Sequence, residues 1–158
     1  MGQFGIGQPV TRFEDPRLLR GQGRFIHDEN LPGQAYLVFV RSPHAHAAIR
    51  AIDASAARAA PGVLGVYTSE DLKRDRVGTT AVTLKRSRPD GSPMFWKAHP
   101  GLAEGRVRHV GDPVAVVVAE TLMQARDAAD MVAVDYADRP SVTATAQAAL
   151  PWSAASVR

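Results

Sequence analysis

The sequence contains no cysteine, and this absence excludes several kinds of site. Disulfides, thiolate metal ligands, iron–sulfur ligation and cysteine nucleophiles all need a thiol. No apolar run approaches the roughly 18 residues that a membrane helix requires. The N-terminal residues do not have the basic and then apolar pattern of a secretion signal. We therefore expect a soluble protein in the cytoplasm.

The composition is that of a folded globular domain. The chain has 158 residues, enough to bury a core without disulfides, and 45% of them are hydrophobic. The formal net charge is +3, with a sequence pI near 9.7. A mildly basic balance permits nucleic-acid binding without requiring it. Length and composition favour one domain.

Short apolar and β-branched runs predict more strands than helices. Strands are expected at 36–41, 48–52, 63–68, 106–110, 114–119 and 132–136. Short helices are expected at 54–60, 70–73 and 122–131, with one helical turn near 15–19. Asp53 is expected to accept a backbone hydrogen bond at the start of 54–60, and Thr121 is expected to cap 122–131. A doubly wound sheet needs more crossover helices than this. The pattern favours an α+β fold with one mixed β-sheet and two or three short helices.

The chain is predicted to have an N-terminal arm (1–20), a domain (21–143) and a loose C-terminal tail (144–158). Residues 75–105 interrupt the domain as a long irregular insertion that is rich in glycine and proline. A β-hairpin is expected around Pro89-Asp90-Gly91. The continuous run 114–119 predicts that Val116 and Val118 lie in the core with Val114.

His44 and His46 are the strongest candidates for metal ligands. On a strand, this spacing places both imidazoles on one face, although a catalytic metal usually has a third protein ligand. His27, His99 and His109 stand in no recognisable ligand motif. We favour histidines that hydrogen-bond locally over a metal pair.

Other patterns with catalytic or binding potential are incomplete. Gly5-Ile6-Gly7 and Gly21-Gln22-Gly23 each lack the third glycine of a dinucleotide fingerprint. Carboxylates occur as adjacent pairs, which point to opposite faces of an extended chain. No serine stands in a nucleophile elbow. We therefore assign no catalytic, cofactor-binding or metal-binding residue to this chain.

A basic and aromatic loop, residues 85–97, is the strongest candidate for a binding surface. Charge beside aromatic rings is typical of single-strand nucleic-acid platforms and also of protein-docking loops. We favour docking and propose Arg86, Arg88, Phe95 and Trp96 as its surface. The alternative is a free-standing binding module that uses this loop, with nucleic acid as one candidate ligand.

Several blocks of sequence, in order, resemble one enzyme family. RFEDPRLL at 12–19 leads into GQGRF at 21–25 and then RSPHAHA at 41–47. GVLGVYT follows at 62–68, and VRHVGDPVAVVVAET at 107–121 leads into VDY at 134–136 and PSV at 140–142. These blocks are similar to those of carbon monoxide dehydrogenase-type large subunits. The family is the xanthine dehydrogenase and aldehyde oxidase group of molybdenum hydroxylases, and the matching segment is its α/β hammerhead domain.

The resemblance implies that this chain is a structural part of a larger oxidoreductase. Such an enzyme hydroxylates a carbon centre or oxidises carbon monoxide at a molybdenum–pterin site, and iron–sulfur clusters and FAD carry the electrons away. The family's catalytic glutamate and pterin loops belong to later domains, and no position here matches them. The resemblance therefore implies an inactive isolated chain whose partners are the downstream molybdopterin-binding domains and the iron–sulfur and flavin subunits.

Overall fold

The computed structural model describes residues 7, 11–80, 86–94 and 98–142, apart from the side chain of His27. The chain divides into two units, Met1–Gln34 and Ala35–Arg158. The first unit contains helix α1 (Asp15–Leu18), which confirms the expected helical turn, and the short 3-10 helix η1 (Ile26–Asp28). Pro16 stands in the first turn of α1, where its missing N–H costs nothing. The division into arm, domain and tail stays a prediction.

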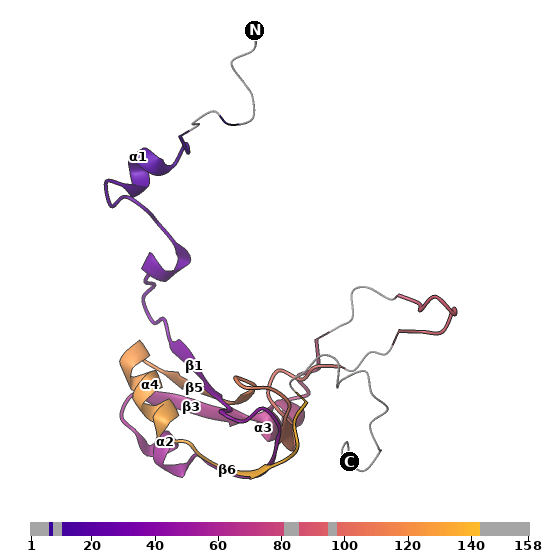
Figure 1. The fold of residues 1–158 in the computed structure, drawn as a ribbon. Helices are drawn as coiled ribbons and strands as arrows, with labels where there is room; N and C mark the ends of the chain where they lie inside the picture. Colours follow the sequence, from indigo (N-terminus) through magenta and orange to yellow (C-terminus); the bar gives the residue numbers. More distant parts are fainter. Residues whose placement is uncertain (1–6, 8–10, 81–85, 95–97, 143–158) are drawn as a thin grey trace. The chain divides into compact units, whose positions relative to one another are not determined.

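The second unit contains two three-stranded sheets and three short helices (Figure 1). The first sheet has the order β1 (Tyr36–Arg41), β5 (Pro113–Ala119), β3 (Val63–Thr68). The second sheet has the order β4 (Arg106–Val107), β2 (Ala47–Asp53), β6 (Ala133–Asp138). The helices are α2 (Ser55–Ala59), α3 (Ser69–Arg74) and α4 (Leu122–Asp130).

The α+β class is confirmed, but the strands form two antiparallel sheets instead of one mixed sheet. Every strand pairing among the described residues is antiparallel. The order β2-α2-β3 is compatible with parallel neighbours, yet β2 and β3 belong to different sheets. The same is true of β5-α4-β6. Each helix therefore connects the two sheets, and no parallel pairing arises.

The main core lies where α2 and α4 meet the sheet of β1, β5 and β3. Small residues at the contact let these elements approach closely. Ala57 of α2 and Ala128 of α4 are fully buried there. Val117 and Ala115 project from β5 into the same cluster. Figure 1 shows α2 and α4 close together beside the strands. The buried residues of this cluster are Ala54, Ala57, Val66, Ala115, Val117, Ala128 and Val132.

Two β-bulges decide which face each side chain of this sheet occupies. The register of β1 against β5 shifts between Val40 and Arg41, which leaves Val114 as the extra residue on β5. A bulge interrupts the alternation of side chains, and Val114 packs inward against Val40 in a second buried cluster. A second shift places Leu64 as the extra residue on β3.

The prediction that Val116 and Val118 share the core with Val114 is confirmed for Val116 and wrong for Val118. Val116 is buried and Val118 is half-buried, but neither belongs to a core cluster. Simple alternation along β5 would place Val114 with them, and the bulge at Val114 breaks that alternation. The residues of β5 that belong to the two core clusters are Val114, Ala115 and Val117.

Local hydrogen bonds explain where the helices and short strands begin and end. The Gln124 N–H donates to Thr121 Oγ1 over 3.2 Å, which confirms Thr121 as the cap of α4. The Ser55 N–H donates to Asp53 Oδ1 at the start of α2, as expected. The strand predicted at 106–110 ends at Val107, because the Arg108 N–H donates to the side chain of Asp112 instead of a neighbouring strand.

The predicted hairpin in the insertion is confirmed by a tight antiparallel turn. Ser87 and Pro93 form an isolated bridge, and the Arg88 N–H donates to Ser92 O over 2.8 Å. Gly91 has φ +81°, a conformation that glycine adopts without strain. This turn is the only regular feature in the described part of residues 75–105.

Candidate functional site

The turn after β1 and the turn before β5 form one buried polar cluster. The Ser42 N–H donates to Asp112 O over 2.9 Å, and the Gly111 N–H donates to Ser42 O over 2.8 Å. Ser42 and Asp112 are each only 2% exposed. Arg41 adds a guanidinium hydrogen bond to Gly111 O. Segments far apart in the sequence, 41–47 and 107–121, are thus joined at one end of the first sheet.

The side chains of this cluster have partners within the cluster. Asp112 Oδ2 accepts from the Arg108 N–H over 2.9 Å, and Ser42 Oγ accepts from the His44 N–H over 3.0 Å. Burial raises the pKa of the nearby Tyr136 phenol, while a hydrogen bond with Ser42 opposes that shift. Buried polar groups with satisfied hydrogen bonds are typical of structural turns. We interpret this cluster as a clamp between two turns.

His44 and His46 are hydrogen-bonded, as expected, but to partners far away in the sequence instead of within their own turn. His44 Nδ1 lies 2.6 Å from Asp138 Oδ1, and its ring contacts Tyr136 with centroids 4.6 Å apart. His46 Nδ1 lies 2.8 Å from Pro140 O. Both imidazoles therefore attach the turn before β2 to the end of β6. The residues that the structure describes contain no group of three histidine, aspartate or glutamate side chains placed to hold a metal ion.

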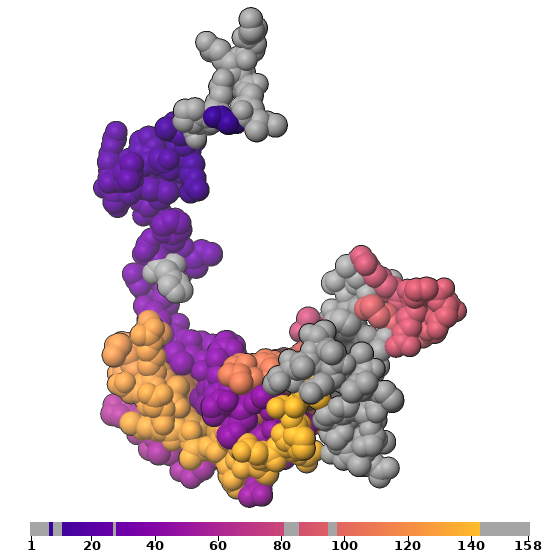
Figure 2. Space-filling model, viewed as in Figure 1, coloured from indigo at the N-terminus to yellow at the C-terminus, as the bar shows by residue number. Residues whose placement is uncertain are grey.

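The proposed docking loop lies only partly within the described residues. Arg86 and Arg88 are exposed on the hairpin of residues 86–94, whose atoms are visible at the surface in Figure 2. Phe95 and Trp96 lie outside the described residues. The docking surface of Arg86, Arg88, Phe95 and Trp96 therefore stays a prediction.

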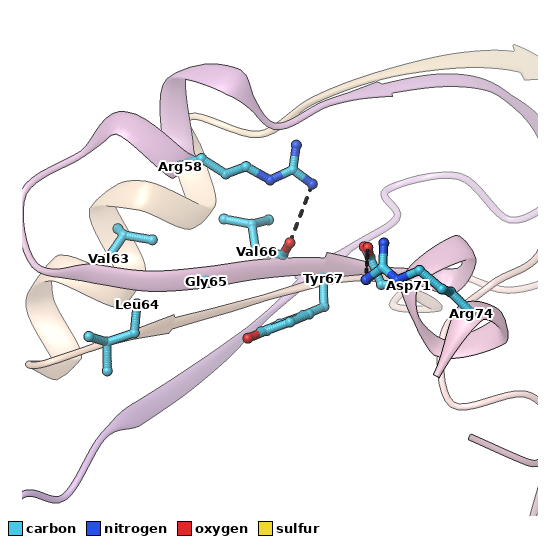
Figure 3. A pocket seen from close by; sticks show the side chains of 8 residues that line it. All are labelled: Arg58, Val63, Leu64, Gly65, Val66, Tyr67, Asp71 and Arg74. Atoms are coloured by element: carbon cyan, nitrogen blue, oxygen red, sulfur yellow. Dashed lines mark hydrogen bonds and ion pairs between the residues drawn. The ribbon is translucent and has the colours of Figure 1, made fainter. Parts of the chain in front are cut away.

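Strand β3 carries a second candidate surface that sequence reasoning missed. Figure 3 shows Val63 and Val66 on one side of this strand and Leu64 and Tyr67 on the other. An open hollow of about 460 Å³ lies along the strand and is also lined by Arg58, Asp71 and Arg74. The Arg58 guanidinium reaches back to Val66 O over 3.4 Å. The hollow combines apolar side chains with a guanidinium.

The charges beside β3 are held by a compact network at the start of α3. Asp71 Oδ2 accepts from the Thr68 N–H over 2.8 Å, and Asp71 Oδ1 lies 2.9 Å from Arg74 Nη2. The Thr68 N–H is the main reason that the pKa of Asp71 lies below its ordinary value, against the opposing effect of partial burial. Arg74 is therefore paired with a carboxylate of the hollow, whereas Arg58 donates to a backbone carbonyl. This arrangement is suited to binding and includes no nucleophile with an adjacent base.

Leu64 and Tyr67 extend into a larger apolar surface, which we call the open face. It is the side of the first sheet that points away from α2 and α4. The register places Leu37 opposite Val118, Phe39 opposite Val116, and Val116 opposite Tyr67. The sequence signal was present, because β5 is apolar at every position and suggested burial on both sides. Sequence reasoning assigned both sides to the domain's own core. The open face consists of Leu37, Phe39, Leu64, Tyr67, Val116 and Val118.

Within the described residues, no helix is long and apolar enough to cross a membrane.

Comparison with protein families places most of the chain in a known domain. The model for "aldehyde oxidase and xanthine dehydrogenase, a/b hammerhead domain" matches residues 20–140. This match includes both sheets, α2, α3 and α4. The family found by this comparison is the one that the sequence blocks resemble.

Individual proteins give the same result. The chain is 44% identical over 130 residues to the nicotine 6-hydroxylase large subunit of Paenarthrobacter nicotinovorans, a match that covers 82% of this chain and 15% of that protein. It is 37% identical to the carbon monoxide dehydrogenase large chain of Afipia carboxidovorans, covering 86% of this chain and 16% of the relative.

Among solved structures, the quinoline 2-oxidoreductase of Pseudomonas putida 86 matches with a TM-score of 0.74 and 40% identity. This match covers 85% of the present chain and 16% of the other. The chain thus spans about one sixth of the length of the proteins it matches.

Proposed function

Because the chain belongs to the aldehyde oxidase and xanthine dehydrogenase family, as its a/b hammerhead domain, we propose that it is a structural domain of a molybdenum hydroxylase large subunit. In this proposal it supports the assembly of the enzyme and catalyses nothing alone. The parent enzyme is an oxidoreductase, as the names of the related hydroxylase and dehydrogenases suggest.

The observation that carries this proposal is that the family model covers most of this chain, whereas the chain covers only a small part of its relatives. The family model matches residues 20–140, yet the alignment with the nicotine 6-hydroxylase large subunit covers only 15% of that protein. The described residues form two sheets, the helices that connect them and a clamp between two turns. Function in this family must be argued from sites rather than from the fold, and the geometry here supports packing better than chemistry.

The donor groups of the described residues lend no support to a metal or iron–sulfur site in this chain. Iron–sulfur clusters are held mainly by cysteine thiolates, and the chain has none. Among the described residues, His44 and His46 are engaged with Asp138 and Pro140 O, and no three ligating side chains converge. We propose that the molybdenum–pterin cofactor, the iron–sulfur clusters and FAD bind elsewhere in the parent enzyme. Its other domains and subunits are then the partners of this chain.

The alternative of a nucleic-acid-binding module gains no support. The relatives described above are named as hydroxylase, dehydrogenase and oxidoreductase proteins. Arg86 and Arg88 are exposed, but exposed arginines are common on protein surfaces and indicate no particular ligand.

Purification of the tagged chain from its own host tests the proposed function. We expect it to be recovered with the rest of a large subunit, on the same or a separate polypeptide, together with molybdenum, iron and flavin. The matched control is the 158-residue chain produced alone in a heterologous host. It is expected to contain none of the three in stoichiometric amount and to show no hydroxylase activity.

Metal analysis, flavin absorbance and peptide mass spectrometry provide the measurements. Recovery of the host-derived chain without any large-subunit sequence and without molybdenum would contradict the proposal. Stoichiometric metal in the chain produced alone, lost on replacing His44 and His46, would show that the domain has its own metal site.

A further inference from the structure

The open face is an apolar surface three strands wide that nothing in the described structure covers. Leu37 is 52% exposed, Phe39 42%, Leu64 58% and Tyr67 40%. Val116 lies between Phe39 and Tyr67 in the register and is itself buried. Contiguous apolar patches of this kind mark interaction sites on soluble proteins.

The open face is also flattened by a close contact between Gly65 and Tyr67. A Cβ atom at position 65 would lie 2.7 Å from the Tyr67 hydroxyl oxygen and 2.8 Å from ring carbons. The aromatic ring therefore lies over Gly65 along the strand instead of standing away from the sheet. Glycine at this position permits the flat arrangement, which suits contact with another broad surface.

A positive group stands at one side of the open face. The Arg41 guanidinium lies 5.3 Å from the centre of the Phe39 ring and is anchored by a hydrogen bond to Gly111 O. Arg58 does not flank this face, because Figure 3 shows it on the side of β3 that carries Val63 and Val66. A second copy docked by the same face would bring the same basic group. A partner with an apolar centre and an acidic side chain at its border fits better.

The free edge of β3 is less suited to binding than its face. Val66 O accepts from Arg58, and the Thr68 N–H donates to Asp71. An added strand would need these backbone groups as hydrogen-bond partners. Their existing partners favour a contact through side chains of the face over strand addition.

On these observations, and resting on the proposed function, we propose that the open face is the surface by which this domain packs against the remainder of the large subunit. The relatives contain more than five times as much sequence outside the matched region as within it. An apolar centre without charged side chains is typical of permanent interfaces, which resemble a domain core cut in half. This composition favours the large subunit itself over a more polar contact with another subunit or a second copy.

Photo-cross-linking in the protein purified from its own host tests this assignment. Phe39 is replaced by p-benzoylphenylalanine, which preserves an aromatic ring on the open face. The control carries the same residue at Met123, which is exposed on α4. We expect the cross-linker at position 39 to join large-subunit peptides outside residues 1–158, and the one at position 123 to do so at least about tenfold less.

Two substitutions measure the energetic role of the open face. Phe39→Glu should weaken association with the remainder of the large subunit by about tenfold or more, because a charge would be buried in an apolar contact. Arg41 can pair with the new carboxylate in the isolated chain, so its Tm should stay within about 3 °C of the wild type. Met123→Glu is the matched control and should change neither quantity.

Gly65→Ala provides an independent variant because it lifts the Tyr67 ring without adding charge. We expect this variant, like Phe39→Glu, to associate more weakly with the remainder of the large subunit. Its circular dichroism spectrum should be nearly unchanged. If Phe39→Glu or Gly65→Ala unfolds the isolated chain, the cross-linking result decides.

The outcomes separate this inference from the proposed function. If the host-derived protein contains no large-subunit sequence beyond residues 1–158, the proposed function fails. If that sequence is present but cross-links to position 123 and not to position 39, only the assignment of the open face is wrong. Cross-links from position 39 to a flavin or iron–sulfur subunit, to nucleic acid or to a second copy would overturn the assignment as well.

Discussion

The sheet of β1, β5 and β3 has two apolar faces, and the domain covers only one. On the inner face, Val117 is fully buried and Val66 is 5% exposed, because α2 and α4 pack against them. On the open face, Leu37 and Phe39 are about half exposed. The residues alternate along the same strands and have the same chemical character. The difference lies in what is packed against them.

This comparison separates stability from assembly. Side chains of the inner face remove apolar area from water when the isolated domain folds, so they stabilise it. On the open face, Leu37, Phe39, Leu64 and Tyr67 leave about half of their area in water until a partner covers them. Substitutions on the inner face should therefore change folding, and equivalent substitutions on the open face should change association.

The largest expected effect comes from placing a charge on each face. Val117→Asp should abolish cooperative unfolding at 25 °C, because an unpaired carboxylate in this core costs about 4 kcal/mol or more. Val118→Asp, one position along the strand, should leave the domain folded with a loss of about 1 kcal/mol, since Val118 is half-buried. Thermal and urea denaturation followed by circular dichroism measure both. Two equally unfolded variants would show that the faces do not differ in this way.

Truncation to alanine makes the same comparison without charge. Val117→Ala should cost about 2 kcal/mol, from two lost methyl groups and the cavity they leave among Ala57, Val66 and Ala128. Val118→Ala should cost about 0.5 kcal/mol. Urea midpoints at constant slope give the two values. Equal losses would indicate that the open face is packed in the isolated chain.

Substitutions at the N-cap of α4 test how strongly the stability of this helix, which covers the inner face, depends on its first turn. Thr121→Ala removes the acceptor for the Gln124 N–H and should cost about 1 kcal/mol. Thr121→Ser is the matched control, because it keeps the hydroxyl and should retain most of the stability. Urea unfolding gives the free energies, and hydrogen exchange of α4 amides should rise in the alanine variant alone. Similar losses in both variants would assign the effect to the threonine methyl group.

The smallest expected effect is a pH dependence at the end of β3. The pKa of Asp71 is lowered in the folded domain, mainly by the Thr68 N–H, so its charged form stabilises the fold. This contribution is present above the ordinary pKa of 3.8 and is lost as the pH falls through the lower folded-state pKa. Asp71→Asn should reduce stability at pH 7 and show a shallower loss on acidification below that value. A pH dependence identical to the wild type would assign acid unfolding to other carboxylates.

Local features of this protein could be predicted from the sequence because their causes are local. The strands at 36–41 and 63–68 have the predicted bounds, since apolar and β-branched residues with nearby turn residues are sufficient to indicate them. Thr121, Asp53 and the turn around Gly91 were identified by capping and turn chemistry. The family was evident from the ordered blocks and is shown by the match over 20–140.

The two sheets, the bulges and the open face were decided by tertiary structure. Which strands pair depends on contacts such as that of β1 with β5, more than 70 residues apart, and no local pattern encodes them. The bulge at Val114 turns this side chain inward and leaves Val116 and Val118 on the opposite face. The apolar run of β5 indicates that both of its faces are buried in the working protein. Only the packing of α2 and α4 shows which face is covered by the domain's own residues.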